Sequence, residues 1–71
     1  MKYLVVIEPT ETGFSAYSPD LPGCVSTGAT PEETEASMLE AINFHIEGLQ
    51  REGESIPPPA TVSRYVEVDA A

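Results

Sequence analysis

The chain changes character at Pro19-Asp20-Leu21-Pro22-Gly23-Cys24, which follows two short apolar segments and precedes a third. Each proline fixes φ and removes a backbone donor, and Gly23 can adopt a positive φ that other residues resist. Residues before a proline are pushed towards extended conformations. The stretch therefore predicts a loop of fixed shape that carries an acid, a large apolar side chain and a thiol. Rigid loops on small scaffolds often carry function.

The segments on either side of this loop have the composition of β-strands. Tyr3–Ile7 is aromatic or β-branched apart from one leucine, which predicts a strand buried on both faces. Phe14–Ser18 alternates loosely, and the turn residues of Pro9–Gly13 predict that it pairs with the first strand as a hairpin. Cys24–Gly28 predicts a short third strand.

A long amphipathic helix is predicted over Pro31–Glu52. Thr30 can cap its first turn, Pro31 suits the first helical position, and Glu33 stands where a capping box needs an acid. Gly53 suits the C-terminal cap. The helix has one apolar face to bury, because large apolar side chains recur at helical spacing at Met38, Ile42, Ile46 and Leu49.

The rest of the chain combines prolines with a second alternating segment. Ile56–Pro59 cannot be helical and predicts a stiff extended linker, whereas Thr61–Val68 alternates and predicts a last strand. The predicted fold is α+β in the order β-β-β-α-β, with a small antiparallel sheet and one long helix packed on one face. We expect residues 1–71 to form a single domain. The other sheet face lacks a cover, which favours a homo-oligomer, a dimer or larger.

Size and charge limit the classes of function. A chain of 71 residues buries only about 60% of its unfolded surface, so we do not expect a deep active site. Twelve acidic and three basic residues give a net charge of −9, which argues against direct nucleic acid binding and favours a basic partner. Solvation of the surface is the alternative interpretation. The N-terminal apolar run is too short for a signal peptide or membrane span, so we expect a cytoplasmic protein.

The pattern assembles no catalytic, cofactor or metal site. His45 is the only histidine and has no nucleophile placed beside it. Glu8 and Asp20 lie near strand ends but do not complete a set of metal ligands. Cys24, the only cysteine, excludes an internal disulfide and is interpreted as a buried, inert thiol. We therefore predict a protein that is not an enzyme and uses no cofactor.

Several of these motifs, in this order, resemble the HicB-like antitoxin family. The resemblance covers about residues 3 to 59 and rests on Gly13-Phe14-Ser15, Pro19–Cys24, Thr30-Pro31-Glu32-Glu33, and Gly53 with Ile56-Pro57. It implies a partial ribonuclease-H-like fold. It also implies that the chain neutralises a small basic HicA-type toxin, an mRNA-cleaving ribonuclease, by masking its surface. Family members usually carry a C-terminal DNA-binding segment, but only twelve residues follow Pro59, so no DNA-binding domain is expected.

Charge and loop placement nominate Glu8, Glu11, Asp20 and Leu21 as the partner-binding residues. Two of them have simpler alternatives, because Asp20 can accept backbone amides within its own turn and Leu21 can fill the domain's own core. Gly48 in the helix predicts the close approach of another backbone, such as that of a second subunit, or is merely a tolerated exposed glycine. The alternative function is a non-enzymatic interaction or scaffold protein without a toxin partner.

Overall fold

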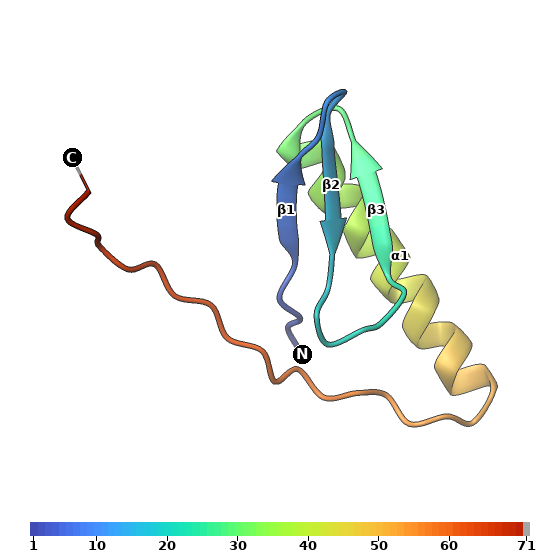
Figure 1. Cartoon of the computed structure of the whole chain (residues 1–71). Helices are drawn as coiled ribbons and strands as arrows, with labels where there is room; N and C mark the ends of the chain where they lie inside the picture. Colours follow the sequence, from blue (N-terminus) through green and yellow to red (C-terminus); the bar gives the residue numbers. More distant parts are fainter. Residues whose placement is uncertain (71) are drawn as a thin grey trace.

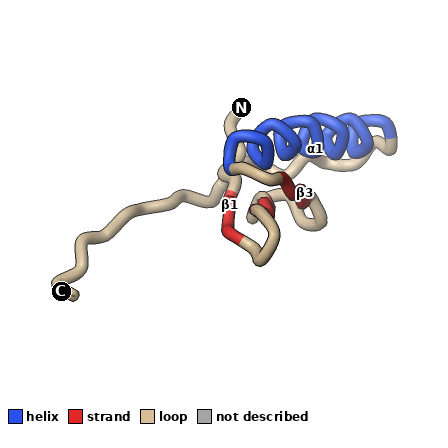
Figure 2. Tube along the Cα trace, turned by 90° about the horizontal axis from the view of Figure 1, so that it is seen from above, coloured by secondary structure: helices blue, strands red, loops and turns tan. Residues whose placement is uncertain are grey.

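A computed structural model describes residues 1–70 as a small antiparallel sheet covered by one helix (Figure 1). The sheet contains β1 (Val6–Pro9), β2 (Phe14–Tyr17) and β3 (Val25–Gly28) in the order β1-β2-β3. Helix α1 (Pro31–Arg51) lies across one face of this sheet (Figure 2). The predicted α+β class, the order of the first four elements and the helix on one face are therefore confirmed.

The strand register decides which side chains face the helix. Ile7 pairs with Ala16, and Ala16 pairs with Ser26. Ala16 belongs to the same buried cluster as Met38 of α1, so this row faces the helix. Successive side chains of a strand point to opposite faces. The neighbouring row, which contains Val6, Tyr17 and Val25, therefore lies on the face away from α1.

The bounds of the first strand differ from the prediction, because β1 begins at Val6 and continues to Pro9. The turn that follows is tight: the Thr10 amide donates to the Gly13 carbonyl at 2.8 Å, and the Thr10 hydroxyl accepts from the Gly13 amide at 3.0 Å. Residues 3–5 precede the paired region, although Tyr3 and Val5 still pack against the core. Their apolar pattern correctly indicated contact with the core, but these residues are only partly buried and do not pair as a strand.

The start of α1 follows the predicted capping pattern with one change. The Thr30 hydroxyl accepts a hydrogen bond from the Glu33 amide at 3.1 Å. The Glu33 carboxylate accepts from the amide of Ala29 at 3.2 Å, one residue before the position of a standard capping box. Acidic side chains in the first turn also meet the positive end of the helix dipole.

The end of α1 lies within one residue of the prediction. Gly53 adopts φ +70° directly after the cap residue Glu52, a conformation that glycine adopts without a steric penalty. Its amide donates to the Gln50 carbonyl at 3.1 Å, and the Glu54 amide donates to the Leu49 carbonyl at 2.9 Å. These two bonds form a Schellman motif, which satisfies carbonyls that the helix leaves free.

The predicted last strand over residues 61–68 is not formed. After α1 the described chain passes beneath the sheet and runs away from the domain as an extended tail (Figure 1). Tyr65 is fully exposed, and the three valines are 72%, 82% and 73% exposed at positions 62, 66 and 68. The radius of gyration is 14.2 Å, against about 11 Å for a compact chain of this length. A strand needs a neighbouring edge, and the alternating pattern alone does not supply one.

Two glycines provide a test of this packing. A Cβ built at Gly28 would lie 2.6 Å from the Thr34 hydroxyl and 2.8 Å from the Thr34 amide nitrogen, whereas none of the described atoms lies within 4 Å of one built at Gly48. We expect Gly28→Ala to destabilise the domain by roughly 1–3 kcal/mol through overpacking. Gly48→Ala is expected to stabilise it by up to about 1 kcal/mol through helix propensity. Denaturant unfolding measures both.

The same pair of variants tests the prediction that another backbone approaches Gly48. A loss of stability in Gly48→Ala, measured at concentrations where copies of the chain associate, would contradict the free position seen within one chain. It would support close packing by a second subunit instead.

Candidate partner-binding surface

The loop between β2 and β3 is shaped around Leu21. The Leu21 amide donates to the Ser18 carbonyl at 3.1 Å, and the Cys24 amide donates to the Leu21 carbonyl at 3.1 Å, so two tight turns follow one another. Gly23, at φ +83°, completes the second turn. These turns insert the Leu21 side chain, which is 0% exposed, into the core. Leu21 thus fills the domain's own core, as the alternative interpretation expected.

Asp20, the residue before Leu21, faces outwards and holds the start of the tail. One carboxylate oxygen accepts from the amides of Ala60 and Thr61 at 3.1 and 3.0 Å, and the other accepts from the Thr61 hydroxyl at 2.8 Å. These hydrogen bonds hold the pKa of the Asp20 carboxyl below its ordinary value of 3.8. The Thr61 amide has the largest effect, followed by the Thr61 hydroxyl and then the Ala60 amide. We call Asp20, Ala60 and Thr61 the tail clasp.

The tail clasp is the main contact that the sequence analysis missed. An Asp in a turn was expected to accept nearby amides, but its partners lie 40 and 41 residues further along the chain. A second link runs beside it, because the Tyr3 hydroxyl donates to the carbonyl of Pro57. No sequence signal pairs these positions, since each group is an ordinary donor or acceptor until the fold brings them together.

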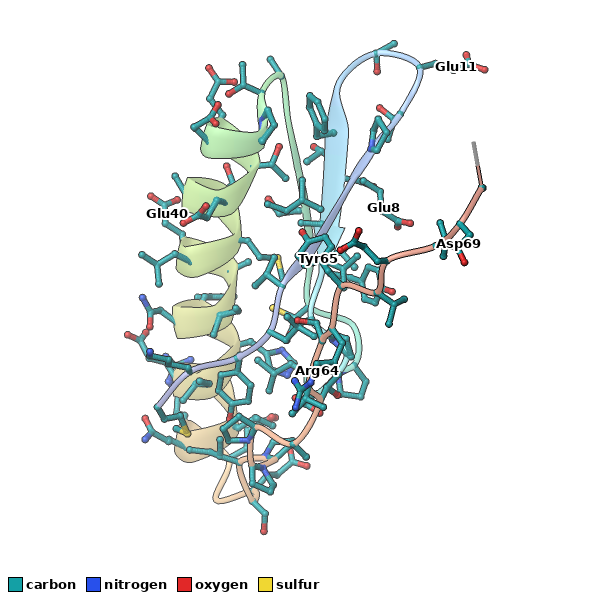
Figure 3. All side chains as sticks on the ribbon, turned by 90° about the vertical axis from the view of Figure 1, so that its left-hand side faces the viewer. Glu8, Glu11, Glu40, Arg64, Tyr65 and Asp69 are labelled. Atoms are coloured by element: carbon teal, nitrogen blue, oxygen red, sulfur yellow. The ribbon has the colours of Figure 1, made fainter. Side chains whose placement is uncertain are left out.

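The predicted partner-binding acids do not form one cluster. Glu8 is exposed on β1, and Glu11 is exposed in the turn before β2, at the tip of the hairpin (Figure 3). Asp20 follows β2 in the loop at the opposite end of that strand. The four predicted residues therefore lie in three different settings. Glu8 and Glu11 are exposed on the β1–β2 hairpin, Asp20 belongs to the tail clasp, and Leu21 is buried.

Helix α1 adds acidic surface beyond the four predicted partner-binding residues. Glu40 projects away from the sheet (Figure 3). The exposed carboxylates of the helix are Glu32, Glu33, Glu35, Glu40 and Glu47. The negative charge of the chain is thus spread over the hairpin tip and the outer side of α1.

The sheet face away from α1 carries an apolar row across all three strands. We call Val6, Tyr17 and Val25 the outer row, because the register places them side by side. Tyr17 is 43% exposed and Val25 is 66% exposed. The sequence analysis expected an uncovered apolar face of this kind. It is a contiguous surface that another protein chain can cover.

The remaining chemically interesting side chains do not converge. Cys24 is buried, and this burial raises the pKa of its thiol. It shares a small groove of about 380 Å³ with His45 and Phe44. Within residues 1–70, no group of three or more His, Cys, Asp or Glu side chains is placed to hold a metal ion. The helix over Pro31–Arg51 is not apolar enough to cross a membrane.

A family model described as the HicB-like antitoxin of bacterial toxin-antitoxin systems matches residues 3–70. The chain belongs to the HicB-like antitoxin family. This membership confirms the resemblance drawn from the proline-rich loop and the helix start, and it extends the match beyond Pro59.

Individual relatives agree with this family. An uncharacterized 14.9 kDa protein of Haemophilus phage HP1 is 38% identical over 66 residues, 93% of this chain and 50% of that protein. A UPF0150 protein of Thermoplasma acidophilum is 41% identical over 80% of this chain and 84% of that protein. Antitoxin HicB 1 of Photorhabdus laumondii is 36% identical over 96% of this chain and 45% of that protein. The chain thus spans about half the length of the phage protein and of the Photorhabdus antitoxin.

A solved structure also matches. A chain of a HicA3 and HicB3 toxin-antitoxin complex superposes with a TM-score of 0.72 at 38% sequence identity. The match covers 83% of this chain and 70% of that chain. At this identity and TM-score, the likeness supports the family assignment as well as the fold.

The tail clasp is expected to open in acid. The folded pKa of Asp20 lies below 3.8, so the clasp is fully formed above that value and is lost as the pH falls through the lowered pKa. We expect the amide resonances of Ala60 and Thr61 to shift together, with a midpoint below pH 3.8. An NMR titration of the purified chain measures this.

Two variants calibrate that titration. Asp20→Ala removes both acceptor oxygens, and with them all three hydrogen bonds, so it should show the released amide shifts at every pH. Asp69→Ala alters an exposed tail acid and should leave the titration unchanged. Amides of Ala60 and Thr61 that are unaffected by Asp20→Ala would contradict the clasp.

Proposed function

We propose that this chain is an antitoxin that neutralises a small basic HicA-type ribonuclease by covering its RNA-cleaving surface. The observation that carries the proposal is the likeness to a chain of the HicA3 and HicB3 toxin-antitoxin complex, at 38% identity and a TM-score of 0.72. The proposed mechanism is steric and electrostatic, so the chain performs no reaction of its own. The proposed site of action is the cytoplasm, where the mRNA substrate of such a toxin is found.

Charge is the proposed basis of toxin recognition. An RNA-cleaving protein binds a polyanion and presents a basic surface, and this chain has a net charge of −9. Glu8 is exposed on β1 and Glu11 is exposed at the hairpin tip, and both are our proposed first contacts. Asp20 is a further proposed contact. It lies in the loop after β2, where it also accepts hydrogen bonds from the tail. Leu21 supports that loop from within the core.

We also propose that the chain functions as a homo-oligomer through its outer row. Val6, Tyr17 and Val25 lie side by side on a face that is open to solvent, and water leaves this surface when a second copy covers it. Glu11 lies in the turn beyond the row, whereas Glu8 shares the face of the row, two residues from Val6.

The electrostatic part of the proposal is tested by charge reversal. Glu8→Lys combined with Glu11→Lys should slow association with a HicA-type toxin by about tenfold or more at low salt. Glu40→Lys combined with Glu47→Lys changes the net charge equally on the outer side of α1 and is the matched control. Stopped-flow or surface binding measures the rates, and growth of cells that express the toxin reports neutralisation.

The outcomes separate the proposed partner from the proposed contacts. If the unaltered chain neither captures the toxin nor rescues growth, the antitoxin proposal is wrong, and an interaction protein with another partner takes its place. If the chain captures the toxin but both double variants slow association equally, the hairpin tip has no special role.

The oligomer proposal has a test of its own. Val25→Lys places a charge in the outer row and should lower the molar mass measured by light scattering. Thr27→Lys lies on the same strand and face but outside the apolar row, and it should change the mass less. A molar mass that is unchanged by Val25→Lys would remove the outer row from the assembly.

A further inference from the structure

An open apolar groove lies between helix α1 and the N-terminal segment that leads into β1. The groove measures about 910 Å³ and separates the N-terminal residues from α1. Its apolar walls come from Tyr3, Val5, Leu39, Ile42 and Ile46. Leu39 is 62% exposed. Because β1 pairs only with β2 among the described strands, its other edge keeps free amides and carbonyls. An unpaired strand edge beside an apolar groove is a site that one more strand can complete.

The same chain carries a segment that fits such a site. Residues 62–68 alternate so that Val62, Val66 and Val68 share one face, with Tyr65 on the other. All of them are exposed, so the segment buries none of its apolar side chains within one molecule. The family match extends to residue 70, which makes the segment part of the domain. An exposed, alternating, valine-rich segment is one that gains free energy by joining a sheet.

Length and charge agree with this fit. Seven residues in an extended strand span about 23 Å, against about 13 Å for the four residues of β1. The added segment would therefore also run along residues 3–5, where Tyr3 and Val5 line the groove. Arg64 lies between Val62 and Val66 on the valine face. The helix wall of the groove carries Glu32 and Glu35, which are suitable counter-charges for a guanidinium group.

The fold holds this segment away from its own groove. Pro57, Pro58 and Pro59 stiffen the linker, and the tail clasp fixes the backbone at Ala60 and Thr61. Figure 1 shows the tail displaced to the side of β1 and diverging from that strand. The clasp therefore presents residues 62–68 outwards, where a second molecule can meet them.

We propose that residues 62–68 add as a fourth strand to the β1 edge of a second copy, with the valine face in that copy's groove. Each chain carries one donor segment and one acceptor groove, so reciprocal exchange closes a two-fold pair. The acceptor site is complete only when the partner contributes its tail. This interface uses none of the outer row and needs no toxin, so it can be tested on the purified chain alone.

The donor side is tested with a proline. Val66→Pro removes a backbone donor from the middle of the segment, at a position that is 82% exposed and distant from the core. We expect it to halve the molar mass measured by light scattering. Ala70→Pro introduces the same residue beyond the valines and should leave the mass unchanged. Circular dichroism confirms that α1 is retained in both variants.

The acceptor side is tested with Leu39→Glu, which charges the groove at an exposed position of α1. This variant should also halve the molar mass. Mixing Leu39→Glu with Val66→Pro provides the decisive measurement. The Leu39→Glu variant keeps an unaltered tail, and the Val66→Pro variant keeps an unaltered groove. We expect the mixture to regain molar mass through one exchanged strand in each mixed pair.

The following outcomes would contradict strand exchange. Strand exchange is wrong if the unaltered chain has the mass of a single copy, or if Val66→Pro keeps the mass of the unaltered chain. It is also wrong if both variants lose mass but their mixture does not recover it, because the tail would then act within its own molecule. A loss of mass in Val25→Lys alone would implicate the outer row and not the exchanged strand.

Discussion

Burial of the Leu21 side chain connects the two halves of this small domain. Leu21 comes from the loop after β2, and it shares the core cluster with Met38 and Ile42 of α1. Full burial of a leucine stabilises a fold by roughly 1.5–3 kcal/mol. A domain of this length has a total stability of roughly 4–10 kcal/mol, so this one side chain supplies a large share. The prolines and Gly23 hold the backbone in the shape that inserts it.

The position of Leu21 also fixes what the neighbouring residue does. With Leu21 inside, Asp20 projects outwards, and its carboxylate meets the backbone at Ala60 and Thr61. The direction of the tail therefore depends on how the loop packs. The same loop supports the core through one residue and sets the course of the distant tail through the next. Its role is that of an internal brace and not that of an active site.

Local interactions explain which features could be predicted from the sequence. The ends of α1 depend on contacts between residues a few positions apart, so Thr30, Glu33 and Gly53 indicated them closely. The first strand was placed less well, because apolar residues at positions 3–5 mark burial and not pairing. The prediction of a last strand was wrong for a single chain. The alternating pattern shows that a segment can form a strand, but it does not show whether a free sheet edge lies beside it. The clasp joins positions 40 residues apart and has no local signal. The family resemblance, in contrast, rested on the order of several local motifs, and the match over residues 3–70 confirmed it.

Cys24 lies beneath the same loop, and its setting affects how the domain responds to oxidants. The thiol is buried, and its pKa is raised, so little of the reactive thiolate is present and reagents cannot reach it. Oxidation of cysteine follows thiolate character and exposure. The folded domain therefore protects this thiol from oxidation. Chemical modification of Cys24 would occur in those molecules whose loop has moved away from the core. The extent of modification would therefore report transient opening of this loop.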